Sequence, residues 1–96
     1  MTAPRVVVYS SRYCGWCTRA LALLEHKGVH PEVINIDLDR AARSEMEDRS
    51  GRRTVPQIFI GDRHIGGYDD LRALDTAGQL DPLLRAEPAA AQQQTS

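Results

Sequence analysis

The chain has 96 residues, enough for one domain with its own core, and its two cysteines are too close in sequence to staple much of it. Twelve basic and thirteen acidic residues are interspersed and leave a net charge of −1, which argues against binding to nucleic acid. The sequence shows neither a membrane-spanning apolar run nor a signal peptide, so we expect a reducing compartment, the cytoplasm.

The first half of the chain is expected to form a βαβ unit. Arg5–Tyr9 is short, rich in β-branched residues and followed by turn residues, as in a buried strand. A helix is expected from Gly15 to Lys27, with Gly28 as its C-terminal cap. Pro31–Asp37 then predicts a second strand. In such a unit the two strands are parallel and the crossover is right-handed.

The second half is expected to add a helix, a hairpin and two more helical segments. The predicted elements are a helix over Arg40–Ser50, a strand over Gln57–Ile60, a turn at Gly61-Asp62-Arg63, an edge strand at His64-Ile65 that is broken by Gly66-Gly67, a helix over Tyr68–Thr76 and a last turn over Leu80–Arg85. Residues 1–86 are therefore predicted to form one domain. Residues 87–96 lack core-forming side chains and are expected to be a disordered tail.

The most informative motif is Cys14-Gly15-Trp16-Cys17, which stands between the first predicted strand and the first predicted helix. Residues i and i+3 of a helix lie on one face, so the two sulfurs can meet and form a disulfide. The unpaired amides and the dipole at a helix start would stabilise a thiolate at Cys14 and draw its pKa below the free value of about 8.5. Cys14 is therefore the predicted nucleophile, and Cys17 is its resolving partner.

Three motifs, in this order along the chain, resemble those of the small bacterial dithiol glutaredoxins. They cover residues 9–17 (YSSRYCGWC), 53–60 (RTVPQIFI) and 66–71 (GGYDDL). The resemblance extends over nearly the whole chain before the tail. It implies a thioredoxin-like α/β fold, with a four-stranded mixed sheet of order 2-1-3-4 flanked by helices. It also implies a glutathione-dependent thiol–disulfide oxidoreductase that reduces glutathione mixed disulfides and protein disulfides through the Cys14 thiolate.

The resemblance further assigns a glutathione site beside the thiols. In the family the proline of Thr54-Val55-Pro56 is cis and faces the active-site cysteines. A cis bond at Pro56 would turn the backbone of Val55 outward, and its amide and carbonyl would pair with the cysteinyl part of glutathione like an added strand. Thr54 and Val55 are therefore expected to contact glutathione. Without the other motifs, the same three residues would be interpreted as an ordinary turn into a strand.

The glycine-aspartate motif is expected to hold the γ-glutamyl end of glutathione. By similarity, Asp69 would accept the ammonium, while the amides of Tyr68 and Asp69 at a helix start would hold the adjacent carboxylate. Gly67 would let that backbone approach the ligand closely. Either Asp69 or Asp70 also stands where an acid caps a helix, and this simpler role is an alternative for Asp69.

Arginines are the candidates for the glycyl carboxylate of glutathione. Arg12, which also corresponds to a basic position that supports the thiolate, and Arg43 on the second predicted helix are assigned to it by similarity. Trp16 would form an aromatic wall over glutathione or over a protein substrate. Three more arginines precede the Thr-Val-Pro motif and form either an anion-binding patch or a solvated helix end. They are Arg49, Arg52 and Arg53.

The residues between the cysteines depart from the Cys-Pro-Tyr-Cys pattern that is usual in this class. Gly15 in place of proline adds an amide near the sulfur and loosens the turn. Glutaredoxins without the proline include members that bind a [2Fe–2S] cluster between two subunits, ligated by the nucleophilic cysteine of each subunit and by two glutathiones. The alternative function is therefore cluster binding or transfer by a homodimer with Cys14 as ligand, whereas the enzyme is expected to be monomeric.

Two further interpretations belong to other classes of protein. A zinc site would combine Cys14 and Cys17 with His26 and His30, but the nine helical residues from Cys17 to His26 span about 13.5 Å, too far for one tetrahedral ion. The histidines, including His64, are therefore expected at the surface or in loops. An inert thioredoxin-like binding domain is the other possibility, since fold alone does not establish activity. It is disfavoured because the residues assigned to glutathione are retained.

Overall fold

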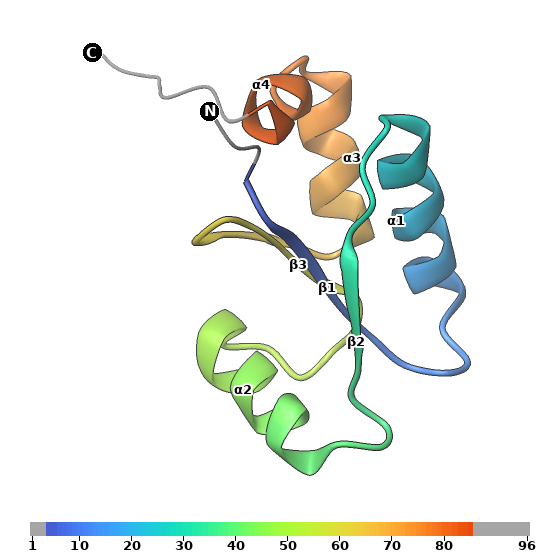
Figure 1. Ribbon diagram of the computed structural model, residues 1–96, viewed down its shortest axis with the longest axis vertical. Coiled ribbons are helices and arrows are strands. Elements are labelled where there is room, and N and C mark those ends of the chain that lie inside the picture. The colour runs from blue at the N-terminus through green and yellow to red at the C-terminus, as the bar shows by residue number, and fades with distance from the viewer. Residues whose placement is uncertain (1–3, 86–96) are drawn as a thin grey trace.

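The computed structural model describes residues 4–85, in which eight helices and strands follow one another. They are β1 (Val6–Ser10), α1 (Gly15–His26), β2 (Glu32–Asn35), α2 (Arg40–Ser50), β3 (Gln57–Ile60), β4 (Arg63–Gly66), α3 (Tyr68–Thr76) and α4 (Leu80–Leu84). The sheet has the order β2-β1-β3-β4 (Figure 1); β1 runs parallel to β2 and antiparallel to β3, and β3 runs antiparallel to β4. The predicted mixed sheet is confirmed, and the tail expected over 87–96 lies outside the described residues.

The helices cover both faces of this sheet, because the central strands β1 and β3 are apolar on both sides. Alternate residues of a strand point to opposite faces. Val6 and Val8 therefore join the core under α1, α3 and α4, whereas Val7 and Tyr9 join a second core under α2. Figure 1 shows α2 separated from the other helices by the sheet. The edge strands β2 and β4 are more exposed, since each has a neighbour on one side only.

Strand β4 includes Gly66, which the sequence indicated as a strand breaker. Ile58 of β3 pairs with Gly66, but the next residue, Phe59, pairs with His64. Ile65 is therefore an extra residue, and the pair of strands contains a β-bulge. Gly66 has φ of +116°, a conformation that glycine adopts readily and other residues rarely do. The glycine thus continues the strand past the bulge and aims the chain toward α3.

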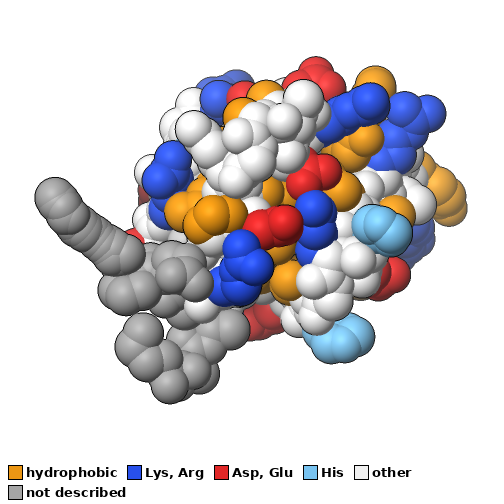
Figure 2. Space-filling view, turned by 90° about the horizontal axis from the view of Figure 1, so that it is seen from above, with side chains coloured by type: hydrophobic (Ala, Val, Ile, Leu, Met, Phe, Trp, Pro, Cys, Tyr) orange, Lys and Arg blue, Asp and Glu red, His pale blue; other side chains and the backbone are white. Residues whose placement is uncertain are grey.

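Ion pairs tie the ends of three helices together away from the thiols. Nζ of Lys27, at the end of α1, lies 2.6 Å from Asp75 of α3 and 3.1 Å from Asp81 of α4. The hydrogen bond to Asp75, and after it the one to Asp81, raises the pKa of Lys27 above its ordinary value. Figure 2 shows this end of the molecule, where basic and acidic side chains are interspersed. No helix within residues 4–85 combines the length and the apolar character needed to cross a membrane.

Candidate active site

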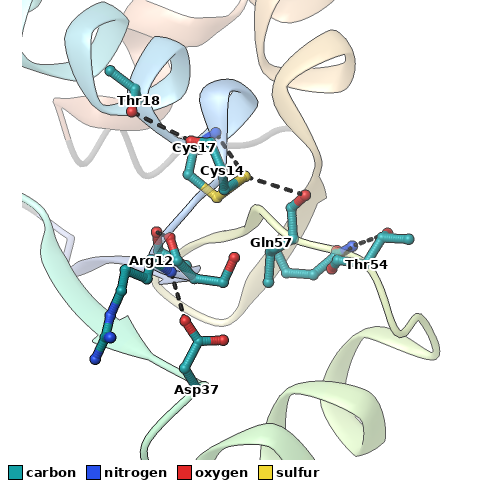
Figure 3. Close-up of a disulfide and its surroundings, with 10 residues drawn as sticks. Arg12, Cys14, Cys17, Thr18, Asp37, Thr54 and Gln57 are labelled. Atoms are coloured by element: carbon teal, nitrogen blue, oxygen red, sulfur yellow. Dashed lines mark hydrogen bonds between the residues drawn. A yellow bond between two sulfur atoms is a disulfide. The ribbon is translucent and has the colours of Figure 1, made fainter.

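The two cysteines lie where β1 passes into α1, as the sequence predicted. Cys14 is the N-cap residue of α1, and its Sγ accepts a hydrogen bond of 3.1 Å from the amide of Cys17. The amide and the hydroxyl of Thr18 both donate to the Cys14 carbonyl, at 3.2 and 3.3 Å. The two sulfurs form a disulfide between Cα atoms 5.2 Å apart (Figure 3). The helix start thus presents the amide of Cys17 to the Cys14 sulfur, which is the arrangement that stabilises a thiolate.

The two sulfurs differ in their access to solvent. Cys17 is 2% exposed, whereas Cys14 is only partly buried. Trp16, between them, is 54% exposed and stacks at 5.7 Å on Tyr68, the first residue of α3. Gly15 is exposed, and a Cβ built on it would meet no atom within 4 Å beyond its chain neighbours and its own helix backbone. A substrate can therefore reach Cys14 but not Cys17.

The loop before β3 faces the sulfurs. The Val55–Pro56 peptide bond is cis, as the resemblance implied. The carbonyl oxygen of Val55 lies 3.8 Å from Sγ of Cys14. Within the described part of the chain, the amide of Val55 donates to no other residue. This short backbone segment is available to pair with an extended ligand next to the nucleophile.

A pocket of about 210 Å³ adjoins this loop and the start of α3. Its lining combines residues that the sequence assigned to glutathione with three that it did not. The assigned residues are Trp16, Thr54, Val55, Pro56, Gly67, Tyr68 and Asp69, and the additional ones are Arg52, Gln57 and Asp70. Segments far apart in the sequence therefore meet around one hollow that lies beside Trp16 of the thiol motif.

Asp70, rather than Asp69, is the acid that caps α3. Its Oδ2 accepts the amide of Gly67 at 2.9 Å and receives Nη1 of Arg52 at 3.2 Å. The Gly67 amide first, and Arg52 after it, hold the pKa of Asp70 below its ordinary value. Asp69 is exposed and lines the pocket without a capping role, so its carboxylate is available to a ligand.

Gly66, rather than the Gly67 that the sequence analysis singled out, is the position that requires glycine. A Cβ on Gly66 would overlap the carboxylate of Asp70, with Cγ only 2.7 Å away. Gly67 has an ordinary φ of −92°, and a Cβ there would lie 3.5 Å from the carbonyl oxygen of Pro56, which is normal contact. Gly67 therefore contributes its amide to the cap of α3 and a surface without a side chain to the pocket.

Arg12 and Arg43 do not line the pocket. The amide of Arg12 donates to Asp37 at 2.6 Å, and its exposed side chain makes no ion pair within residues 4–85. Figure 3 shows that side chain directed away from the sulfurs. Arg43 lines a separate hollow with Asp37 and Leu38 in the β2–α2 connection. The structure thus places both arginines at the same corner of the molecule, next to Asp37.

The arginines before the Thr-Val-Pro motif separate into different roles. Arg52 lines the pocket. Arg49, which is exposed in the last turn of α2, instead donates to the hydroxyl of Tyr9 at 3.1 Å and lies over the ring of Phe59 at 4.0 Å, so it contacts the edge of the core under that helix. The alternative of a solvated helix end therefore fits this exposed residue. The spacing of Arg49 and Arg52 in the sequence does not predict these different contacts.

The histidines also differ from one another. His26 and His30 are exposed, as predicted. His64 is partly buried in β4, where it stacks on Phe59 at 4.9 Å and contacts Gln57, so the prediction of a simple surface histidine is wrong for this residue. Among residues 4–85, no group of three or more His, Cys, Asp or Glu side chains is placed to hold a metal ion.

A Cys-x-x-Cys pair at the start of the first helix, facing a cis-proline before β3 of a mixed sheet, defines a thioredoxin-like thiol–disulfide oxidoreductase. The family model described as Glutaredoxin matches residues 6–65. Glutaredoxin 3 of Escherichia coli (strain K12) is 56% identical over 80 residues, which are 83% of this chain and 96% of that protein. The chain belongs to the glutaredoxin family, the glutathione-dependent thiol–disulfide oxidoreductases.

Solved structures support the same assignment. A crystal structure of a buckwheat glutaredoxin–glutathione complex matches with a TM-score of 0.80 and 35% identity, covering 92% of this chain and 83% of the other. The holo form of glutaredoxin C1 from Populus tremula x tremuloides matches with a TM-score of 0.79 and 35% identity, covering 94% and 84%. The thioredoxin-like fold is therefore confirmed.

Proposed function

We propose that this glutaredoxin reduces mixed disulfides between glutathione and protein thiols by a route that needs only Cys14. The Cys14 thiolate attacks the glutathione sulfur, the protein thiolate leaves and takes a proton from water, and glutathione stays bound as a mixed disulfide with Cys14. The thiolate of a second glutathione attacks the same glutathione sulfur. This step forms glutathione disulfide and returns the Cys14 thiolate.

For disulfides within or between proteins, we propose a second route that uses both thiols. Cys14 attacks one sulfur of the substrate and forms a mixed disulfide with the protein. The Cys17 thiolate then attacks the Cys14 sulfur, which releases the reduced protein and leaves the Cys14–Cys17 disulfide. Two glutathiones reduce this disulfide and leave as glutathione disulfide. Glutathionylated and disulfide-containing proteins are thus the proposed partners, and the cytoplasm, with its reduced glutathione, is the proposed location.

The proposed binding site of glutathione is the pocket beside Trp16. The amide and carbonyl of Val55 would pair with the cysteinyl residue, which brings its sulfur to the Cys14 side of the loop. Asp69 would accept the ammonium, and the first amides of α3, at Tyr68 and Asp69, would hold the γ-glutamyl carboxylate. The exposure of Asp69 and the capping role of Asp70 support this division of roles.

The glycyl carboxylate needs a cation at the other end of the ligand. An extended tripeptide spans about 10 Å, so it can run beyond the pocket lining. Arg12 and Arg43 remain the proposed partners, and Arg52 joins them because it lines the pocket itself. Replacing each in turn by glutamine should weaken glutathione binding only where the arginine contacts the carboxylate. Arg53→Gln, in the same exposed loop but outside the lining, is the matched control.

The observation that carries the one-thiol route is the unequal burial of the two sulfurs, with Cys17 2% exposed and Cys14 accessible. The test is glutathione-dependent reduction of a glutathionylated peptide by the wild type, Cys14→Ser and Cys17→Ser. We expect Cys14→Ser to abolish turnover and Cys17→Ser to retain it. Loss of turnover in Cys17→Ser, with the fold intact by circular dichroism, would contradict the assignment of roles.

A second candidate function is to bind a [2Fe–2S] cluster between two copies of the chain. The exposed Gly15 in place of the usual proline favours it, and so does the similarity to a poplar glutaredoxin that was solved in a holo form. In such a dimer, each copy would supply the Cys14 thiolate, and two glutathiones in the pockets would supply the other ligands. Reconstitution with iron, sulfide and glutathione should then give a coloured dimer, and Cys14→Ser should give neither colour nor dimer. A colourless monomer after reconstitution of the wild type would count against this function.

A further inference from the structure

Gln57 is a fully buried polar side chain directly after the cis-proline, with 1% of its surface exposed. Its Nε2 donates to the carbonyl of Thr54 at 3.0 Å and lies 3.3 Å from the Thr54 hydroxyl (Figure 3). This amide therefore bridges the turn that contains Val55 and Pro56. In the described part of the chain, no other residue forms a hydrogen bond with Thr54. The position of the loop thus depends on which way the Gln57 amide faces.

His64 contacts the other end of the Gln57 amide. Because the amide nitrogen of Gln57 must face the Thr54 carbonyl, its oxygen Oε1 faces Nε2 of His64, 2.7 Å away. Nε2 of His64 must then carry a hydrogen and donate it. The ring is held in place by its stacking on Phe59 at 4.9 Å. His64, Gln57 and Thr54 thus form a hydrogen-bonded chain from the edge strand β4 to the active-site loop.

The surroundings of His64 favour a neutral ring. Burial first, and then the charge of Arg52, lower its pKa below the ordinary 6.5, with Arg49 acting in the same direction and Asp70 against it. A neutral imidazole has one N–H, and the contact with Gln57 places it on Nε2. Protonation would leave that donor in place, so the chain of hydrogen bonds persists in both forms of the ring.

We propose that His64 and Gln57 are positioning residues for the glutathione pocket: His64 orients the Gln57 amide, and Gln57 holds Thr54 so that the Val55 backbone faces the ligand. The proposal rests on the proposed function, since it assumes that Val55 pairs with glutathione. Without the His64 donor, Oε1 of Gln57 is buried and unpaired, which is unfavourable. The amide then turns or the loop shifts, and Val55 loses its alignment.

The test compares two variants of the full chain that separate the donor from the ring. His64→Phe keeps an aromatic ring on Phe59 but has no donor, whereas His64→Gln loses the ring but keeps an amide N–H near the place of Nε2. KM and kcat are measured with a glutathionylated peptide. From the usual strength of one hydrogen bond, we expect His64→Phe to raise KM about five- to tenfold, with kcat changed less than about twofold. His64→Gln should stay within about twofold of the wild type in both constants.

A merely structural His64 gives a different pattern: both variants lower the thermal midpoint, and KM of the folded protein stays unchanged. Unchanged KM in folded His64→Phe overturns the proposal. If the wild type itself shows no turnover, the proposed function fails. Amide NMR of the ligand-free proteins then tests whether His64 positions the loop. Displaced signals of Thr54 and Val55 in His64→Phe but not in His64→Gln then support it. Signals at wild-type positions in both variants refute it.

Discussion

Replacing Gly66 by alanine tests how the β-bulge and the start of α3 build the pocket. The residue has φ of +116°, where a residue with a side chain is strained by about 1–3 kcal/mol. The new Cβ would also overlap the Asp70 carboxylate, with Cγ 2.7 Å away. Asp70 must then leave the Gly67 amide, and the lost cap costs about 1 kcal/mol. We therefore expect Gly66→Ala to lower the free energy of unfolding by about 2–4 kcal/mol.

The assay is unfolding in urea, followed by circular dichroism, with Gly67→Ala as the matched control. Alanine at position 67 meets only an ordinary contact and keeps an allowed φ, so its cost should not exceed about 1 kcal/mol. In an Asp70→Ala background, Gly66→Ala should cost about 1 kcal/mol less, because the cap has already been removed. Equal costs for the two glycine variants in the wild-type background would refute the reasoning.

Substitutions at three other sites test single contacts. The pKa of Asp70 is lowered by folding, so its carboxylate stabilises the fold above its unfolded value of 3.8, and this contribution is lost as pH falls through the folded pKa. Asp70→Asn should therefore flatten the decline of the unfolding free energy in that acid range, as urea titrations at several pH values would show. Asp39 caps α2 by accepting two amides, at 3.0 and 3.1 Å, so Asp39→Ala should cost about 1 kcal/mol in urea unfolding and Asp39→Asn much less. Arg49→Met removes the partner of the buried Tyr9 hydroxyl and should cost about 1–3 kcal/mol, but clearly less in a Tyr9→Phe background.

Most of the fold could be predicted because its signals are local. The apolar run of β1 has the length of a strand, and α1 is bounded by the thiol motif and by Gly28, whose φ is +81°. The strand order does not follow from such local patterns. It came from the resemblance, because motifs in the right order specify which segments meet around the sulfurs.

The details of the site could not be predicted where neighbouring residues have the same chemistry. Asp69 and Asp70 have the same side chain. The start of α3 at Tyr68 alone decides which of the two carboxylates accepts the Gly67 amide. That start depends in turn on the bulge at Ile65, which sequence patterns do not reveal. The contact of Arg49 with the core likewise depends on the ring of Phe59 on another element.

Adjacent residues of the pocket have different roles: one is held by hydrogen bonds within the protein, and its neighbour is free to bind a ligand. The loop can therefore be stable and still bind. Thr54 is tied to Gln57, while the amide of the next residue, Val55, has no partner within the described chain. Asp70 caps α3, while its neighbour Asp69 is exposed at the pocket. A polar group without a hydrogen-bond partner in the protein is tolerated only where water or a ligand can reach it. Substitutions at Asp70 should therefore act first on stability, and substitutions at Asp69 first on the KM for glutathione.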